Sequence, residues 1–247
     1  MTVLALPIRP EGQGRLKDLV ALTMTWAILG LLVIQWVPIL LDLDPAKIAI
    51  DYNLYVEATQ RALAGGGYYL PYQVAGPYAA DPGVILYPPP FILVMVPFLV
   101  LPWPFYWALP IAAVAWAIWM LRPRITWWPV MAFCLWWPGT LITLVAGNPV
   151  LLFTGAMALA TLWYWPAVAI FLKPSLFPFA LFGIWKRSWW IALGVAILIS
   201  LPFGAMWIDY IAVVRNAQHE LGLLYNFGQA PTLALPLAAW AGRTRRR

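Results

Sequence analysis

Two ionisable residues in apolar surroundings are the strongest candidates for chemistry. Asp51 lies near the start of a polar stretch that follows the first long apolar run, and Lys173 lies inside the apolar run Pro166–Trp185. An acid at a helix N-terminus is favoured by capping and by the helix dipole, so Asp51 has a structural interpretation and a functional one, as a general base. An ammonium group in lipid costs roughly 2.5–3.5 kcal/mol at a helix centre, so Lys173 either reaches out to an interface or contacts an anion, such as a lipid phosphate, in a cavity.

Other reactive arrangements are missing from the sequence. The patterns GxGxxG, the Walker loop, HExxH and paired CxxC do not occur. His219 is the single histidine, so a histidine-rich metal site is excluded; a lone loop histidine is usually solvated, and a catalytic role is the alternative. Cys134 is the single cysteine, so no intrachain disulfide can form. We therefore expect neither a metal nor a cofactor.

The composition indicates that most of the chain lies in lipid. Of the 247 residues, 64% are hydrophobic and 10% are charged, whereas soluble domains are about half apolar and about a quarter charged. A soluble fold cannot bury that much apolar surface. The net charge of +6 is explained by basic residues at membrane edges rather than by binding of nucleic acid. The partner we expect first is membrane lipid.

The apolar segments are the elements that must position Asp51 and Lys173. Several are shorter than the roughly 20 residues of a span or are broken by proline. Broken helices are tolerated where they line a cavity, although a kinked bundle without a cavity is the alternative. The sequence predicts an all-α, polytopic transmembrane helical bundle of about seven to nine membrane segments in a single domain, 1–247. The apolar segments are Leu19–Leu41, Pro88–Leu101, Trp103–Leu121, Trp127–Val145, Pro149–Trp165, Pro166–Trp185, Trp189–Trp207 and Pro231–Ala241.

The distribution of lysine and arginine predicts the orientation. Basic residues concentrate on the cytoplasmic side of membrane proteins, and here they occur before Leu19, at Lys186 and Arg187, and in the tail from Arg243 onward. Seven of the nine acidic residues lie in the connections on the other side of the membrane from these basic residues. We therefore expect an integral protein of the bacterial inner (cell) membrane, with cytoplasmic N- and C-termini.

The same rule makes two predictions about individual segments. If Arg122 and Arg124 are cytoplasmic, an even number of crossings must precede Lys186, so Pro166–Trp185 should be a hairpin that turns near Lys173. The stretch from Pro88 to Leu121 is too long for one span. Either part of it is re-entrant, or the two arginines break the rule.

The first external loop, 42–87, is the most polar part of the chain. Apolar residues recur with helical spacing over Asp51–Leu63, and Gly65-Gly66-Gly67 should end that helix. The tyrosines and prolines that follow suit the membrane interface, where aromatic rings are enriched. The loop is therefore predicted to carry an interfacial amphipathic helix.

Several motifs resemble glycosyltransferase family 87, a family of the GT-C superfamily of polytopic transferases that use polyprenyl-phosphate sugars. The similarity extends over about Leu19–Leu235, with the motifs in the family's order. The matching motifs are Asp51-Tyr52-Asn53-Leu54-Tyr55, Ala62-Leu63-Ala64-Gly65-Gly66-Gly67-Tyr68-Tyr69, Tyr87-Pro88-Pro89-Pro90, Leu101-Pro102, Gly147-Asn148-Pro149-Val150-Leu151-Leu152, Leu172-Lys173-Pro174, Lys186-Arg187-Ser188-Trp189 and Asn226–Thr232.

The resemblance implies transfer of a hexosyl or pentosyl group from a polyprenyl-phosphate donor to an acceptor on the non-cytoplasmic face. Asp51 would deprotonate or orient the acceptor hydroxyl. Positive charge for the leaving lipid phosphate would come from Lys173 first, or from Arg61 or Arg215. Further substrate contacts are expected from residues within the matching motifs: Tyr55, Tyr87 and Asn148.

The chain departs from the family pattern in two places. The expected glutamine of the motif around Asn148 is missing, and the chain is C-terminally short, ending soon after the Asn226–Thr232 element. A non-catalytic subunit of a larger membrane complex, built on the same scaffold, is therefore the second hypothesis. A transporter or lipid-binding membrane protein is the third, although no inverted repeat is evident.

Overall fold

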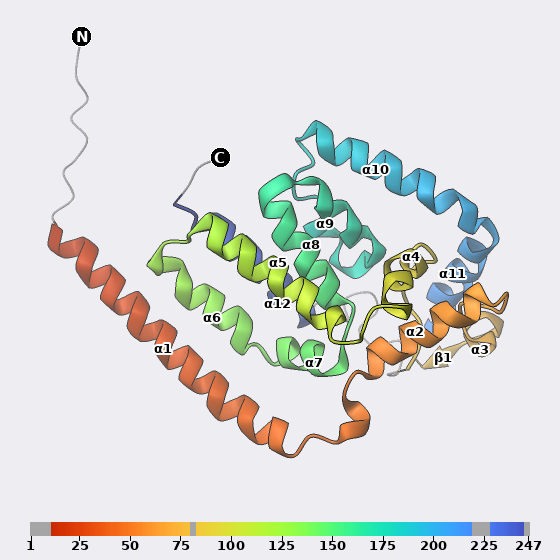
Figure 1. Ribbon diagram of the computed structural model, residues 1–247, viewed down its shortest axis with the longest axis horizontal. Coiled ribbons are helices and arrows are strands. Elements are labelled where there is room, and N and C mark those ends of the chain that lie inside the picture. Colours follow the sequence, from red (N-terminus) through yellow and green to blue (C-terminus); the bar gives the residue numbers. More distant parts are fainter. Residues whose placement is uncertain (1–10, 80–82, 219–227, 245–247) are drawn as a thin grey trace, which may run out of the picture.

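The computed structural model describes residues 11–79, 83–218 and 228–244, and these are mostly helical (Figure 1). His219 and Asn226, which the sequence singled out, lie outside the described residues. The α-helices are α1 (Glu11–Leu41), α2 (Ile50–Leu63), α3 (Pro71–Ala75), α4 (Phe91–Met95), α5 (Phe105–Leu121), α6 (Trp128–Trp136), α7 (Pro138–Ala146), α8 (Val150–Trp163), α9 (Phe177–Ala180), α10 (Arg187–Ser200), α11 (Gly204–Asn216) and α12 (Ala230–Ala241). The 3₁₀ helices and strands are η1 (Pro45–Lys47), η2 (Val96–Leu99), η3 (Ile125–Trp127), η4 (Trp165–Leu172), η5 (Pro174–Leu176), η6 (Leu201–Phe203), β1 (Tyr78–Ala79) and β2 (Ala217–Gln218).

Two helical stretches are long and apolar enough to cross a membrane within the described part of the chain. They are Gly14–Leu41 and Arg187–Asn216. A third possibility is the pair Ile125–Trp136 and Pro138–Ala146, which is bent by 55° at the intervening residue. The structure thus supports a helical protein with two or three candidate spans. The larger predicted number, seven to nine segments, stays a prediction.

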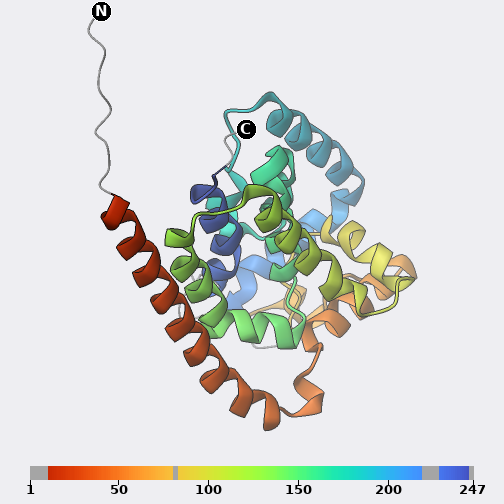
Figure 2. The same ribbon diagram turned by 60° about the vertical axis from the view of Figure 1, so that its left-hand side comes forward.

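Helix α1 lies along one side of the molecule and packs against α6 (Figures 1 and 2). Much of its apolar surface faces outward; Trp26 is 70% exposed and Ile34 is 71% exposed. In water such exposure would be unfavourable by about 25 cal/mol per Å². Lipid removes this cost, because a helix that satisfies its own backbone hydrogen bonds can present an apolar surface to it.

The centre of the molecule is built on the pairing of α5 with α8, the most extensive contact between two helices. Gly155 of α8 permits it, because a Cβ atom at this position would lie 2.9 Å from the Cα atom of Pro110 in α5. Helix α12 packs against α8 and α6 on another side. The aromatic residues Tyr55, Tyr87 and Phe91 connect this centre to α2.

The segment predicted to be a hairpin does double back. The chain runs through η4, turns at Lys173 and returns through η5 and α9, which packs against η4. The two ends of the hairpin lie close together. Lys186, just after the hairpin, places its Nζ atom 5.2 Å from the centre of the ring of Tyr164, just before it. The turn at Lys173 therefore lies at the far end of the hairpin from Lys186.

The stretch after Tyr87 is divided into short helices and one longer one, and whether part of it is re-entrant stays a prediction. Helices α4 and η2 are short and pack against α2, and only α5 continues as a long apolar helix to Leu121. Prolines at Pro97, Pro102 and Pro104 interrupt the helix because each removes a backbone donor.

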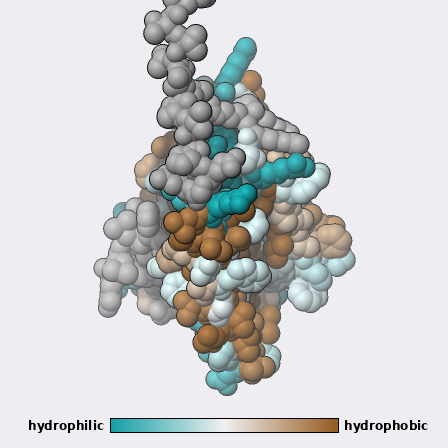
Figure 3. Space-filling model, turned by 90° about the vertical axis from the view of Figure 1, so that its left-hand side faces the viewer, coloured by the Kyte–Doolittle hydropathy of each residue, from teal (hydrophilic) through white to brown (hydrophobic). Residues whose placement is uncertain are grey.

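Basic side chains gather at one end of the molecule. The backbone of Pro123 bridges to Arg243, Arg124 N donates to Gly242 O, and the Arg243 guanidinium stacks on Trp240 at 4.0 Å. The Trp240 ring in turn contacts Phe182, close to the ends of the hairpin. On the face of the molecule shown in Figure 3, most of the strongly hydrophilic surface lies toward the top, and apolar surface covers much of the middle.

The opposite region joins the loop after α2 to α11. Helix α11 packs on α3, and β1 pairs in parallel with β2. Asn216 Nδ2 donates to the carbonyl oxygens of Gln73 and Val74, and the Tyr78 hydroxyl donates to Val213 O. The two strands are the small part of the described chain that is not helical, and side-chain hydrogen bonds hold them because two residues per strand provide too few backbone ones.

We expect Gly155→Ala to destabilise the protein. Alanine improves helix propensity by up to about 1 kcal/mol, but the new methyl group meets the backbone of Pro110, and overpacking costs about 1–3 kcal/mol. Thermal unfolding in detergent should therefore show a lower Tm. The matched control is Gly194→Ala in α10, where no atom lies within 4 Å of the added carbon. An unchanged Tm for Gly155→Ala would contradict the close approach of α5 and α8.

Candidate functional site

The start of α2 is held in place by the backbone of Ala49. This residue adopts the left-handed conformation, with φ 60°, and its N–H donates to Val145 O at the end of α7. A non-glycine residue pays of order 1–2 kcal/mol for that conformation. The hydrogen bond to α7 maintains it and directs the first turn of α2, including Asp51, toward α7. No side chain caps this helix, so Asp51 is an acid in the first turn and not the N-cap.

A glycine turn brings Asn148 to the same place. Gly147 ends α7 with φ +64°, and a Cβ atom here would lie 2.9 Å from Tyr52 Cβ in α2. The next residue, Asn148, accepts a hydrogen bond from Val150 N through its Oδ1 atom at 3.1 Å. Its Nδ2 atom therefore faces the other way, toward Asp51. Glycine is required here because the turn needs both a positive φ and close contact with α2.

Asp51 and Asn148 form the central polar contact of the site. Asn148 Nδ2 donates to Asp51 Oδ2 at 2.6 Å. The other carboxylate oxygen, Oδ1, has no hydrogen-bond partner among the described residues, so it is free to accept a proton or a substrate hydroxyl. Burial raises the pKa of Asp51, and this effect outweighs the Asn148 hydrogen bond and the positive charge of Lys173, which both lower it. A carboxyl with a raised pKa is suited to general-base chemistry.

Lys173 lies at the turn of the hairpin and is only 6% exposed. Its Nζ atom donates to the Tyr87 hydroxyl at 2.9 Å and lies 5.0 Å from the centre of the same ring. The ammonium is therefore buried inside the protein, and the alternative in which it reaches out to an interface is wrong. A buried ammonium needs a compensating charge or dipole, and the negative charge of Asp51 interacts with it.

Both residues line one cavity of about 530 Å³, which we call the Asp51 pocket. Its walls come from the C-terminal end of α1, the start of α2, the stretch before Pro88, α7 and the hairpin turn. The cavity falls within the range of about 300–1,000 Å³ typical of small-molecule sites. The lining residues are Gln35, Ile39, Leu43, Lys47, Ile50, Asp51, Tyr55, Gly83, Val84, Leu86, Tyr87, Pro138, Leu141, Ile142, Val145, Ala146, Asn148, Lys173 and Gln229.

The pocket brings together most of the residues predicted to form the site. Asp51, Tyr55, Tyr87, Asn148 and Lys173 all line it, although they come from different elements. Their catalytic and substrate-binding roles stay predictions.

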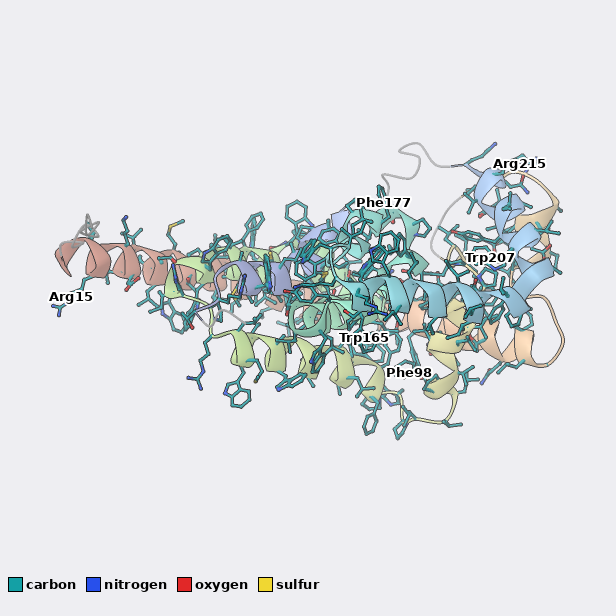
Figure 4. All side chains as sticks on the ribbon, turned by 90° about the horizontal axis from the view of Figure 1, so that it is seen from above. Arg15, Phe98, Trp165, Phe177, Trp207 and Arg215 are labelled. Carbon is teal, nitrogen blue, oxygen red and sulfur yellow. The ribbon has the colours of Figure 1, made fainter. Side chains whose placement is uncertain are left out.

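The two arginines predicted as alternative phosphate contacts do not line the pocket. Arg61 is engaged at the end of α2, where its guanidinium donates to Gly67 O and Tyr68 O, both at 2.7 Å. Arg215 is exposed and points outward at the end of α11 (Figure 4). Their positions have a physical reason: local carbonyl groups satisfy the Arg61 guanidinium, and the Arg215 guanidinium is exposed.

Three polar lining residues were missed by the sequence interpretation: Gln35, Lys47 and Gln229. Lys47 is exposed, and Gln35 lies within the long apolar stretch Leu19–Leu41 of α1. A polar residue near the end of a predicted span was the available signal for Gln35. Two lysines and one aspartate line the pocket, a formal excess of one basic side chain, which suits an anionic ligand.

The chemistry available in this pocket is acid–base and electrostatic. Among the residues that the structure describes, no group of three or more histidine, cysteine, aspartate or glutamate side chains is placed to hold a metal ion. What the pocket offers is one carboxyl, a buried ammonium and an amide that orients the carboxyl.

Comparison with known proteins finds no matching family model, no similar curated protein and no similar solved structure. The resemblance to glycosyltransferase family 87 therefore stays a prediction that rests on its motifs.

We expect Asp51→Asn to become progressively stabilising, relative to the wild type, as the pH rises from about 4 to 7. The folded-state pKa of Asp51 is raised, so the stability that its protonated form contributes is present below the unfolded pKa of about 3.9 and is lost as the pH rises through the folded value. Asparagine cannot ionise and still accepts from Asn148. The difference in Tm between the two proteins, measured in one detergent over this pH range, tests the sign.

The control for this comparison is Asp42→Asn, which changes an exposed acid in the same connection. Because the Asp42 side chain is exposed, this replacement should change the Tm by less than Asp51→Asn does. A pH-independent difference for Asp51→Asn, or one that shrinks as the pH rises, would contradict the burial of this carboxyl.

Proposed function

We propose that the chain is a polytopic membrane protein whose Asp51 pocket opens on the non-cytoplasmic side. Two observations support the orientation. The pocket lies at the C-terminal end of α1 and the N-terminal ends of α8 and α12. The basic residues gather at the opposite ends of these helices, and such residues mark the cytoplasmic side of membrane proteins. Shorter apolar helices, α5, α8 and α12, would complete the bundle around the candidate spans.

Within that orientation, we propose a glycosyltransferase that uses a polyprenyl-phosphate sugar. Asp51 takes the proton of an acceptor hydroxyl as its oxygen attacks the anomeric carbon. The bond between that carbon and the phosphate oxygen breaks, and the configuration inverts. The electron pair leaves on the lipid phosphate, where positive charge from Lys173 stabilises it.

The observation that carries this proposal is the meeting of a carboxylate and a buried ammonium in one pocket. Asp51 and Lys173 are distant in the sequence, yet both line the same cavity, and each has a second group that orients it: Asn148 for the carboxyl and Tyr87 for the ammonium. A base for the nucleophile and a cation for the leaving group are the two functions that displacement at a sugar phosphate needs.

A neighbouring apolar cleft supports a lipid-linked donor. This cleft, of about 750 Å³, lies between α4, η4 and α10. Pro88 and Leu172 line it, while the adjacent residues Tyr87 and Lys173 line the Asp51 pocket. The same two chain segments therefore separate an apolar compartment from a charged one. Such an arrangement suits a ligand with a hydrocarbon chain and a phosphate head.

The second candidate is a membrane protein that binds a lipid phosphate without chemistry, as a transporter or as a subunit of a larger complex. The apolar cleft and the pocket cations favour it as much as they favour a transferase. The carboxylate favours the transferase, because a negative group beside a phosphate site weakens binding, whereas a reaction can use it as a base.

We expect Asp51→Asn to lower the rate of sugar transfer from a polyprenyl-phosphate donor by about 10²–10⁴-fold, the usual contribution of a general base. Donor affinity should be preserved or improved, because a negative charge is removed. The measurement is transfer from radiolabelled polyprenyl-phosphate mannose and arabinose to lipid-extractable and polymeric acceptors, together with donor binding in detergent.

Asp42→Asn serves as the control, with an expected rate equal to that of the wild type. Full transfer activity in Asp51→Asn would refute the catalytic assignment. Tight donor binding by a wild-type protein that transfers nothing would favour the second candidate.

A further inference from the structure

The wall of the Asp51 pocket that carries Tyr87 has no regular secondary structure. Residues 83–87 form neither helix nor strand. They line the cavity at four positions: Gly83, Val84, Leu86 and Tyr87. The buried N–H and C=O groups of such a segment are not paired within a helix or a sheet, so they need other partners. Side chains from residues 69–73 supply them.

Gln73, in α3, holds this wall at Ile85. The glutamine is fully buried, with an exposed fraction of 0%. Its Nε2 atom donates to Ile85 O at 3.1 Å, and its Oε1 atom accepts from Ile85 N at 3.4 Å and from Leu70 N at 3.3 Å. One amide therefore pairs both backbone groups of Ile85, as a neighbouring strand would. Since buried polar groups are unfavourable without partners, these bonds restrict where the wall can lie.

Tyr69 holds the same wall two residues further on. Its hydroxyl donates to the backbone carbonyl oxygen of Tyr87 at 3.0 Å, and its ring stacks on Tyr210 of α11 at 6.2 Å. The side chain of Tyr87 in turn accepts from Lys173 Nζ at 2.9 Å. A continuous series of contacts therefore runs from Gln73 and Tyr69, through the backbone of the wall, to the buried ammonium.

Gln73 is itself anchored on α11. Its carbonyl oxygen accepts from Asn216 Nδ2 at 3.1 Å, and the same amide donates to Val74 O at 3.0 Å. Among the described residues, Gln73 is not one of those that line the Asp51 pocket or the apolar cleft. Any effect of this side chain on a ligand in the pocket must therefore pass through the wall that it holds.

We propose that Gln73, assisted by Tyr69, is a positioning residue for Lys173. It fixes the backbone of the pocket wall, so that the Tyr87 hydroxyl holds the ammonium in one position for the leaving phosphate. This inference rests on the proposed function, which assigns the ammonium to that phosphate. Positioning matters because a displacement of about 1 Å can cost about 10²-fold in rate, even when the mutation is remote from the chemistry.

A double-mutant cycle on sugar transfer tests the proposal. Gln73→Met removes both ends of the amide at similar length, and it should lower kcat about ten- to a hundredfold. In a Tyr87→Phe background the same change should cost less than about threefold, because the hydroxyl through which it acts is gone. Equal fold losses in the two backgrounds would show independent effects and overturn the proposal. Gln60→Met, at an exposed glutamine of α2, is the matched control and should transfer at the wild-type rate.

Chemical labelling of Lys173 tests the positioning without any need for transfer. Acylation of its amine by an N-hydroxysuccinimide ester, followed by mass spectrometry, should be severalfold faster in Gln73→Met than in the wild type. Alkylation of Cys134, which is buried in α6, reports general loosening of the fold and should not change. Tyr69→Phe removes a single hydroxyl and should act on Lys173 in the same direction, so it replaces Gln73→Met if that variant does not fold.

The labelling outcomes separate this inference from the proposed function. Unchanged labelling of Lys173, or faster labelling of Lys173 and Cys134 together, would overturn the positioning role, because the second result marks only a destabilised fold. A wild-type protein that transfers no sugar, but whose Lys173 becomes reactive in Gln73→Met while Cys134 does not, would refute the transferase and leave the positioning of the ammonium in place.

Discussion

The hydrogen bond between Asn148 and Asp51 is the contact on which the arrangement of the site depends. At 2.6 Å it joins the first turn of α2 to the turn between α7 and α8. Two backbone features make it possible: the left-handed conformation of Ala49 and the glycine turn at Gly147. Each is unfavourable or restrictive by itself and is retained because the neighbouring helix supports it. The result is a carboxyl with one oxygen oriented by the protein and one left open to the pocket.

The buried ammonium of Lys173 imposes the complementary constraint. A hairpin of short and 3₁₀ helices is a poor way to fill a membrane core, because it satisfies fewer backbone hydrogen bonds than a continuous helix. Here it delivers a cation to the interior, against Tyr87 and opposite Asp51. The broken segments thus place a charged side chain in the interior of the protein, where a continuous apolar helix would place an apolar one.

Whether a polar side chain has hydrogen-bond partners nearby distinguishes Arg61 from the polar groups that line the pocket. Arg61 is satisfied by carbonyl groups at the end of its own helix, whereas the amide oxygens of Gln35 and Gln229 have no such neighbours. A polar side chain with nearby partners stabilises the fold. One that is buried without a partner lowers stability.

The sequence by itself determined the apolar character of the chain, the helix after Asp51 with its glycine end, the doubling back at Lys173 and the identity of the two charged residues. These follow from composition, helical spacing and charge distribution, which act over short distances along the chain. Only the tertiary structure decided that Asp51, Asn148 and Lys173 share one pocket, that Arg61 does not, and that Gln35 and Gln229 complete it. Those outcomes depend on how α1, α7, α12 and the hairpin pack, and packing is set by side-chain shape across elements with no regular sequence spacing between them.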